Sequence, residues 1–393
     1  MNLILFDDHS WDNLLPLTYT KPAAELRVGI LKIREKWEIH LNKKASFLTK
    51  GYLQTKYTAA IAQDNLLVNG TVLPDKNIIS AINSLGTGES LKKGNTLLAI
   101  ITDTSKFDLI NPDLHDNAKE YTGEISQIDY PWKIFSLNGQ EINQDYHLLT
   151  KSRKSGSLSE SVNIIGQDNI FVEEGFKGEF FTVNASEGPV YLGADSEIME
   201  GAVIRGPFAL CEHATIKLSS KIYGPTTIGP YSKAGGEINN AVIQGYSNKG
   251  HDGFLGNAVI GEWCNLGADT NNSNLKNNYA DVKIWNYPSG CFINTGLQFC
   301  GLVMGDHSKC GINTMFNTGT VVGVSANIFG SGFPRNFIPS FTWGGAHGSK
   351  EYKIDKAFET MQLVMERRGL GLSEADKDIY QRIFRDTAPY RHK

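Results

Sequence analysis

An aliphatic residue recurs at every sixth position between residues 192 and 234. The positions are Leu192, Ile198, Ile204, Leu210, Ile216, Ile222, Ile228 and Ala234, and a second run comprises Met304, Cys310, Phe316, Val322 and Ile328. A period of six fits neither an α-helix nor a simple strand, and it is the hexapeptide repeat of a parallel β-helix. We therefore expect three hexads to form one triangular coil. The aliphatic residue of each hexad points inward, and small or turn-forming residues occupy the corners.

Ahead of the repeats, strand-like and helix-like segments alternate. The segments NLILF, ASFLT, NLLVNG and NTLLAIIT are expected as strands, the last three of them buried and parallel. Helices are expected at DKNIISAINSL and at AAELRVGILKIREKWEIHL, whose apolar face comprises Leu26, Ile30, Ile33 and Trp37. This alternation predicts an α/β layered sheet in the N-terminal region.

Behind the repeats, two amphipathic helices are predicted. The first has apolar positions at Ile354, Phe358, Met361 and Met365. The second begins at Ser373, with Asp376 at the capping-box position, and carries Ile379, Tyr380, Ile383 and Phe384. An apolar stripe usually marks a buried face, so packing against the coils is favoured over a functional lid. The predicted regions are an α/β domain at 1–165, a β-helix at 166–345 with a polar loop near 270–295, and a helical tail at 346–393.

The composition restricts the classes of molecule that the chain is expected to bind. The net charge is −4 and there is no run of basic residues, which argues against nucleic acid. No apolar stretch is long enough to cross a membrane, and the first residues, MNLILFDDHS, lack the basic start of a signal peptide, so we expect no membrane partner and a cytoplasmic location. The cysteines at positions 211, 264, 291, 300 and 310 include no CxxC pair. They are expected as small buried residues rather than as disulfides or a metal site.

An α/β domain followed by a left-handed β-helix resembles the GlmU-like family of bifunctional sugar-1-phosphate nucleotidyltransferases and amino-sugar-1-phosphate acetyltransferases. In the first half, LLPLTYTKPAAELRVG and DYPWKIFSLN carry the resemblance. The first of these resembles a motif that cradles nucleotide phosphates. However, DDHSWDN has no glycine where the family has a glycine-rich loop, and Asp12, Ala23 and Thr71 stand where it has an arginine, a lysine and a magnesium-binding aspartate. The resemblance implies a shortened, degenerate nucleotidyltransferase domain with a Rossmann-like sheet, which needs Mg²⁺ only if it is active.

Two basic residues in this half could replace the missing phosphate contacts. They are Lys21 and Arg27, which flank the motif's AAEL segment. Solvated surface charge is the expected role for both.

The second half resembles the acetyltransferase active-site region over residues 237–275, which read EINNAVIQGYSNKGHDGFLGNAVIGEWCNLGADTNNSNL. The resemblance places His251 at the position of the family's catalytic histidine. An amino sugar is largely an ammonium ion at neutral pH and must lose a proton before it attacks a thioester, and histidine suits that base. The resemblance also places Glu237 at the carboxylate that orients the imidazole.

The remaining site residues are implied by the same resemblance. It implies substrate contacts at Asn239, Phe254, Asn265, Asn274, Lys221 and Lys283, and acetyl-CoA contacts at Ala268 and Ile312. Asn239 stands at a family lysine and Phe254 at a family tyrosine. Because a site that loses polar contacts discriminates differently between similar substrates, a changed acceptor is expected.

Three functions are compatible with the sequence. The leading one is a CoA-dependent N-acetyltransferase acting on an amino-sugar phosphate or a nucleotide-linked amino sugar in cell-envelope sugar-nucleotide synthesis, with acetyl-CoA as co-substrate. The second is a sugar-1-phosphate nucleotidyltransferase with a non-standard phosphate loop. The third is a non-catalytic regulatory subunit. The family implies a homotrimer under all three, and the sequence leaves the acceptor sugar, the acyl group and any nucleotide open.

Overall fold

The computed structural model describes residues 1–102 and 118–391. Its contacts divide the chain into two compact units. The first comprises Met1–Leu14, Thr20–Leu26 and Leu31–Tyr130, and the second comprises Leu15–Tyr19, Arg27–Ile30 and Pro131–Lys393. The domain boundaries predicted at residues 165 and 345 stay predictions, because a division of the chain by its contacts does not test them.

The first unit is built on a six-stranded sheet with the order β2-β1-β3-β5-β4-β6. Its strands are β1 (Asn2–Phe6), β2 (Ala45–Leu48), β3 (Asn65–Asn69), β4 (Ser90–Lys93), β5 (Thr96–Thr102) and β6 (Lys119–Glu120). Strand β1 is parallel to β2 and β3, but β5 is antiparallel to both β3 and β4. The prediction of a parallel strand at NTLLAIIT is therefore wrong. The connection from β4 to β5 is a two-residue turn in which Gly94 has a positive φ of 55°, and so short a link can join only antiparallel strands.

The helices of this unit are α1 (Ser10–Asn13), the 3₁₀ helix η1 (Ala23–Glu25), α2 (Ile33–Leu41) and α3 (Lys76–Asn83). The long helix predicted from Ala23 to Leu41 is therefore interrupted. Gly29 has a φ of 79°, and its N–H donates to Asn138 Oδ1 rather than to a helical carbonyl. Leu26 and Ile30 are buried as predicted, but they do not lie on the face of a helix.

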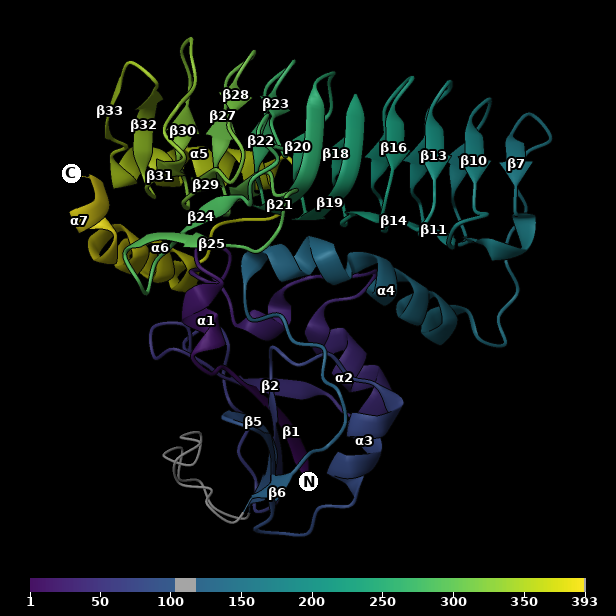
Figure 1. Ribbon diagram of the computed structural model, residues 1–393, viewed down its shortest axis with the longest axis vertical. Coiled ribbons are helices and arrows are strands. Elements are labelled where there is room, and N and C mark those ends of the chain that lie inside the picture. The colour runs from purple at the N-terminus through teal and green to yellow at the C-terminus, as the bar shows by residue number, and fades with distance from the viewer. Residues whose placement is uncertain (103–117, 392–393) are drawn as a thin grey trace. The chain divides into compact units, whose positions relative to one another are not determined.

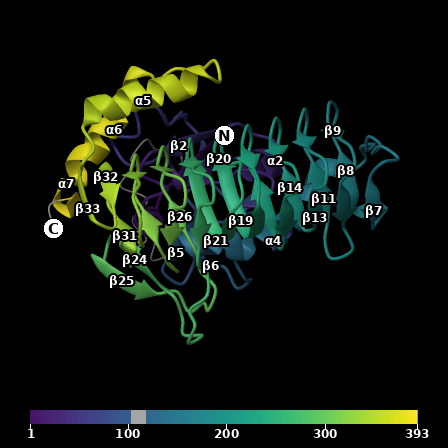
Figure 2. The same cartoon turned by 90° about the horizontal axis from the view of Figure 1, so that it is seen from above.

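The second unit contains a left-handed parallel β-helix of about ten coils, as the repeat predicted. Figures 1 and 2 show its short strands stacked side by side. One column comprises β7 (Asn163–Ile165), β10 (Thr182–Asn184), β13 (Val203–Arg205), β16 (Lys221–Tyr223), β19 (Glu237–Gly245), β21 (Phe254–Glu262), β26 (Val303–Met304), β29 (Val321–Val322) and β31 (Phe337–Ile338). Another, joined to it at β19, comprises β8 (Ile170–Val172), β11 (Val190–Leu192), β14 (Phe208–Leu210) and β17 (Thr226–Ile228).

The third column forms a separate sheet. It comprises β9 (Lys177–Gly178), β12 (Glu197–Ile198), β15 (Thr215–Ile216), β18 (Lys233–Ala234), β20 (Asn248–Lys249), β22 (Asn265–Leu266), β27 (Lys309–Cys310), β30 (Asn327–Ile328), β32 (Thr342–Gly345) and β33 (Gly348–Glu351). All thirteen residues of the two six-residue registers are buried in one continuous core. The inward direction predicted for them is therefore confirmed.

The predicted polar loop near 270–295 leaves the stack of coils. It follows β23 (Asn271–Asn272), which pairs with β28 (Met315–Phe316), and it contains the antiparallel hairpin of β24 (Lys283–Asn286) and β25 (Cys291–Asn294). Exposed Cys291 lies in this hairpin, so the prediction of a buried side chain is wrong there, because the hairpin lies outside the coils. The other four cysteines are buried, and all five are free thiols.

Helices cover parts of the β-helix. Helix α4 (Pro131–Thr150) packs along it, and Asp145 Oδ2 of α4 accepts the N–H of Ile30. The tail forms α5 (Ile354–Glu366), α6 (Glu374–Asp386) and α7 (Ala388–Arg391), and Ser373 and Asp376 form the predicted capping box. Tyr380 of α6 meets His307 edge to face at 5.5 Å between ring centroids, which confirms that the tail packs against the coils.

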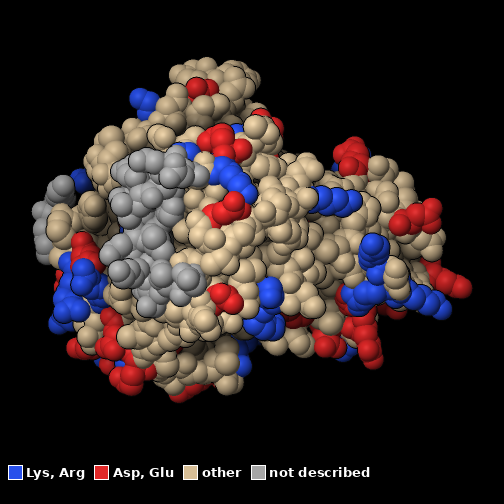
Figure 3. All heavy atoms as spheres, turned by 90° about the horizontal axis from the view of Figure 1, so that it is seen from below, with Lys and Arg blue, Asp and Glu red and all other residues tan. Residues whose placement is uncertain are grey.

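One face of the molecule is mixed in charge. On the face drawn in Figure 3, acidic and basic side chains are interspersed rather than gathered in one patch. Within residues 1–102 and 118–391, no helix has the length and apolar character needed to cross a membrane. The same residues contain no group of three or more histidine, cysteine, aspartate or glutamate side chains placed to hold a metal ion.

Candidate active site

A groove of about 720 Å³ runs along the third column of the β-helix. Its floor is a ladder of outward-facing side chains at in-register positions of β18, β20, β22 and β27, namely Lys233, Asn248, Asn265 and Lys309. Because the inward neighbours of these residues form the core, the strand alternation itself points the ladder into the groove.

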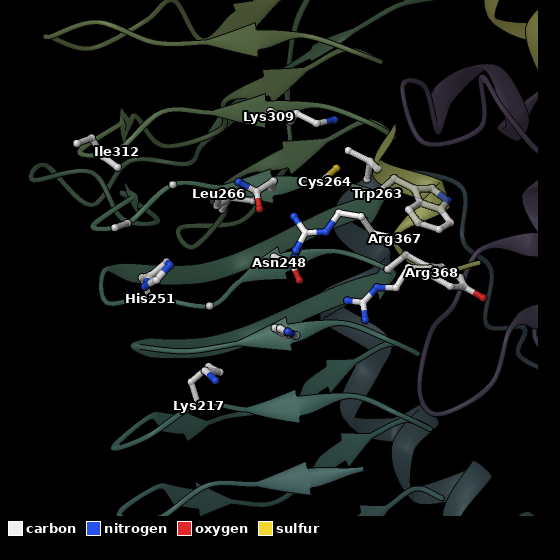
Figure 4. Close-up of a pocket in the computed structure, with 17 residues that line it drawn as sticks. Lys217, Asn248, His251, Trp263, Cys264, Leu266, Lys309, Ile312, Arg367 and Arg368 are labelled. Carbon is white, nitrogen blue, oxygen red and sulfur yellow. The ribbon is translucent and has the colours of Figure 1, made fainter. Parts of the chain in front are cut away.

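His251 lies at one end of the groove, and the end of helix α5 contributes to its lining. Figure 4 shows His251 in the turn after β20, with Ile312 in a turn of a later coil. Arg367 and Arg368, which directly follow α5, extend toward Asn248 in the same view. The sequence predicted the helix α5 but not that its end would contribute to a groove.

A stack of rings forms the other border of the groove. The rings are His213, Tyr231, Tyr246, Trp263 and His307, with centroid separations of 4.6, 5.1, 4.3 and 5.9 Å along the stack. All five residues have φ between 54° and 63°, a backbone conformation that is uncommon without glycine. Tyr246 and Trp263 line the groove. The sequence analysis missed this ring stack, although one ring in each successive coil was a detectable signal.

The groove is strongly cationic. Five basic side chains line it, namely Lys217, Lys233, Lys309, Arg367 and Arg368, and no carboxylate is among the described residues that line it. Burial lowers the pKa of Lys309 to about 8, and its Nζ donates to His307 O at 2.9 Å. A groove lined in this way suits a multiply charged anion such as a phosphate ester, because ammonium and guanidinium groups form charge-assisted hydrogen bonds with phosphate oxygens.

His251 is exposed at the corner between the groove and the neighbouring β19–β21 face. Strand registers pair Lys233 with Asn248 and Glu237 with Phe254, so the turn at 235–236 is two residues shorter than the turn at 250–253. The shorter turn consists of two glycines, and it therefore places no side chain beside His251. A Cβ atom added to Gly236 would lie 2.9 Å from His251 O, so a larger residue there would displace the histidine turn.

Three predicted site residues form a column on that neighbouring face. Lys221, Glu237 and Phe254 occupy in-register positions of β16, β19 and β21. The N–H of Glu237 donates to Gly253 O at 3.2 Å, which places Glu237 beside the His251 turn. Among the described residues, the Glu237 carboxylate accepts a hydrogen bond from the Tyr223 hydroxyl at 2.5 Å, and no hydrogen bond joins it to the His251 imidazole. The orienting role of Glu237 stays a prediction.

The other predicted residues fall into two groups. Asn265, Ala268 and Ile312 line the groove together with His251. Asn239 lies in β19 opposite Gly256, and Asn274 donates from Nδ2 to Asn257 Oδ1 at 2.8 Å, which places both near the Phe254 column. Lys283 lies apart from both groups, exposed on the β24–β25 hairpin.

In the first unit, polar side chains at the carboxyl ends of the strands bind one another. Lys50 Nζ pairs with Asp12 Oδ2 at 2.9 Å. The Thr71 hydroxyl donates to Asn69 Oδ1 at 2.7 Å and accepts from Gln127 Nε2 at 2.9 Å. The position at which the family holds magnesium therefore offers a hydroxyl that is already bonded on both sides, and it does not fit the ion.

The expectation that Lys21 and Arg27 are solvated is wrong, since both are buried at 3% and 5% exposure. The backbone of Arg27 exchanges two hydrogen bonds with the Gln244 side chain, at 2.6 and 3.0 Å. Its guanidinium donates to Ile30 O. These bonds tie the 27–30 segment to the β-helix and give Arg27 a structural role.

Comparisons with known proteins give a family match and several relatives. Residues 3–154 match the family described as sugar nucleotidyl transferase. A bifunctional sugar-1-phosphate nucleotidylyltransferase/acetyltransferase from Sulfurisphaera tokodaii is 29% identical over 58% of this chain and 50% of its own length. The bifunctional protein GlmU of Methanocaldococcus jannaschii is 27% identical over 66% of this chain and 55% of its own length. The chain thus spans about half the length of these relatives.

A shorter relative aligns with part of the chain. An uncharacterized acetyltransferase of Escherichia coli, YaiX, is 28% identical over 41% of this chain and 70% of its own length. The crystal structure of the polySia specific acetyltransferase NeuO aligns with 49% of this chain and 87% of its own, at 14% identity and a TM-score of 0.24. The sequence matches confirm the predicted resemblance: residues 3–154 match the sugar nucleotidyl transferase family, and the chain is similar to bifunctional proteins that include GlmU.

Proposed function

We propose that the chain is a CoA-dependent acyltransferase that acylates the amine of an amino-sugar phosphate or a nucleotide-linked amino sugar. The observation that carries this proposal is the cationic groove that leads to His251. The relatives named as acetyltransferases support the reaction class.

The groove takes the acyl-CoA in this proposal. The phosphate groups of CoA carry several negative charges, and they are matched by Arg367, Arg368 and Lys309. Ala268 and Ile312 flank the thioester end near His251. The acyl carbonyl carbon then lies beside the corner at which the two faces of the β-helix meet.

The acceptor occupies the neighbouring face, beside the column of Lys221, Glu237 and Phe254. Lys221 is the cation of this column and is assigned to the sugar phosphate. Phe254 and Asn239 offer fewer charged or hydroxyl contacts than the family's residues at these positions, so we expect an acceptor other than unmodified glucosamine 1-phosphate to be preferred.

The proposed chemistry needs one base. His251 accepts a proton from the acceptor's ammonium, and the free amine attacks the thioester carbonyl carbon. The bond from carbon to sulfur breaks as the amide forms. The imidazolium gives its proton to the departing thiolate, and the second proton of the attacking nitrogen leaves to solvent. Glu237 is assigned as the positioning carboxylate for the imidazole, and a homotrimer would supply further groups to this exposed corner from a neighbouring copy.

The experiment that tests the proposal measures thiol release from acetyl-CoA with a panel of amino-sugar phosphates and nucleotide-linked amino sugars. We expect His251→Ala to lower kcat by about 100- to 10,000-fold, the usual contribution of a general base. His347→Ala is the matched control, because His347 is exposed on the β32–β33 turn and does not line the groove. No thiol release by the folded wild type across the panel would contradict the proposal and favour a non-catalytic assembly.

A nucleotidyltransferase is the second candidate, favoured by the family match to residues 3–154. The bonded Thr71 hydroxyl and the pairing of Lys50 with Asp12 disfavour it, because they leave neither a carboxylate for Mg²⁺ at that position nor an unpaired ammonium at Lys50. Pyrophosphate release from a nucleoside triphosphate and a sugar 1-phosphate, measured with Mg²⁺, distinguishes the two candidates.

A further inference from the structure

A lysine occupies the apolar core directly before the His251 turn. Lys249 stands in register with Ala234 of the preceding coil, and Leu266 takes the same inward position in the next coil. Only 2% of Lys249 is exposed. A buried ammonium is unfavourable unless hydrogen bonds replace its water, so its partners indicate what it does.

The ammonium of Lys249 is fully bonded to backbone carbonyls. Its Nζ donates to Gly235 O at 2.9 Å, to Asp252 O at 3.1 Å and to His251 O. Three N–H donors thus meet three acceptors, two of which belong to the turn at 250–253 and one to the shorter turn beneath it.

Other turns of the same column are held in a different way. In each of three turns, a hydroxyl donates to the carbonyl three residues earlier: Ser220 to Lys217, Thr270 to Gly267 and Thr314 to Gly311, at 2.6 to 2.8 Å. The matching position in the histidine turn is Gly253, whose φ is 109°. A side chain there would overlap Thr270 O, so a hydroxyl cannot hold this turn.

We infer that Lys249 is a positioning residue whose ammonium, acting from inside the coil, fixes the turn that presents His251 to the groove. The inference rests on the proposed function for its catalytic consequence, but its structural part stands alone. Asp252, Asp269 and the Cys310 thiol are the titratable groups around Lys249. Burial lowers the pKa of Lys249 to about 8, so above that pH one of the three carbonyls loses its donor.

The test uses the full chain with Lys249→Met, which removes the charge but keeps an unbranched chain of similar length. Hydrogen exchange read by mass spectrometry should rise in peptides that cover 250–253 and stay unchanged in the strands of the same coil. In the thiol-release assay, kcat should fall by about 10- to 100-fold while the KM for acetyl-CoA changes by less than about threefold, because a misplaced base affects the chemical step. The fall in wild-type kcat above about pH 8 should disappear in Lys249→Met.

Ile216→Met is the matched control, because Ile216 occupies the same inward column two coils earlier and belongs to the apolar core. Unchanged exchange at 250–253 in Lys249→Met would overturn the inference, as would an unchanged kcat. Loosening of the whole coil, with a Tm below that of Ile216→Met, would also overturn it, because Lys249 would then serve only the core. If the wild type transfers no acyl group, the proposed function fails and the exchange experiment still decides whether Lys249 holds the turn.

Discussion

The polar side chains of the two units differ in whether they bond to one another or line a cavity. At the strand ends of the first unit, Lys50 pairs with Asp12, and the Thr71 hydroxyl is bonded on both sides. In the groove of the β-helix, Lys217, Lys233 and Arg367 form no ion pair within the described residues, and they line an open cavity. Cations that are already paired add little attraction for an incoming phosphate, whereas cations held toward a cavity without carboxylates attract one strongly.

This contrast shows where ligand binding should be sought. The family match covers residues 3–154, yet side chains there form hydrogen bonds with one another. In the second unit, the coils hold the cations of the groove with no carboxylate among the described lining residues, and each strand is fixed by the strands on either side. Binding capacity therefore follows the arrangement of the side chains rather than the fold that carries them.

Reversing the charge of the groove is the strongest test of this difference between the two units. We expect the double variant Arg367→Glu, Arg368→Glu to raise the KM for acetyl-CoA about 100-fold, with kcat at saturation little changed, because the arginines bind the donor equally in the ground and transition states. Steady-state kinetics at several salt concentrations measure this. Arg385→Glu, at an exposed position of α6 outside the groove, is the control, and an unchanged KM in the double variant would show that the groove does not bind the donor.

Ligand-induced stabilisation compares the two units in one experiment. Acetyl-CoA at about 100 times its Kd should stabilise the protein by about 2.7 kcal/mol, which is visible as a rise in Tm. Added to protein that is saturated with acetyl-CoA, a nucleoside triphosphate with Mg²⁺ should raise Tm no further, because the groove is then filled and the strand-end groups are occupied with one another. A further rise with the nucleotide would reverse the comparison and favour nucleotidyl transfer.

The repeat predicted much of the second unit because its physical cause is local. Each inward aliphatic residue, such as Ile204 or Ile222, is buried by the coils on either side, so one period fixes the direction of every side chain in the strands. Asn265 was found through the family resemblance, and the structure places it in the ladder that lines the groove. His251 was found through the matching segment, and the structure places it at the corner of the groove.

Features that depend on distant segments were not predictable in this way. The lining supplied by Arg367 and Arg368 depends on how the tail packs, which their own sequence does not encode. The antiparallel direction of β5 depends on a short turn at Gly94, which outweighed the parallel pattern expected from an apolar run. Buried Arg27 shows the same limit, because its partner Gln244 is more than two hundred residues away.

The strand-end network of the first unit should make stability depend on pH. Burial raises the pKa of Asp7 from its ordinary 3.8 to about 7, while hydrogen bonds from Thr49 and from the Ala23 N–H oppose part of this rise. Between about pH 4 and 7 the folded state then holds a proton that the unfolded state has lost, so the free energy of unfolding falls as the pH rises.

Asp7→Asn should remove this dependence. We expect the wild type to lose about 2 kcal/mol more than the variant between pH 5 and pH 8, a value discounted for the partial exposure of Asp7. Urea unfolding at several pH values measures the difference. Parallel curves for the two proteins would mean that Asp7 is ionised in the folded state and that the network is more open than its contacts indicate.

The smallest expected effect concerns the pair between Asp12 and Lys50. Both side chains are about two-fifths exposed, at 41% and 38%, so Asp12→Asn should change the free energy of unfolding by less than about 1 kcal/mol. The variant is informative because it leaves Lys50 charged and without its carboxylate partner. Equilibrium binding of a nucleoside triphosphate should strengthen by no more than about tenfold, since one exposed cation contributes little on its own. A larger gain would mean that this single pair, rather than the whole bonded network, prevents phosphate binding in the first unit, and the contrast with the groove would then rest on one residue.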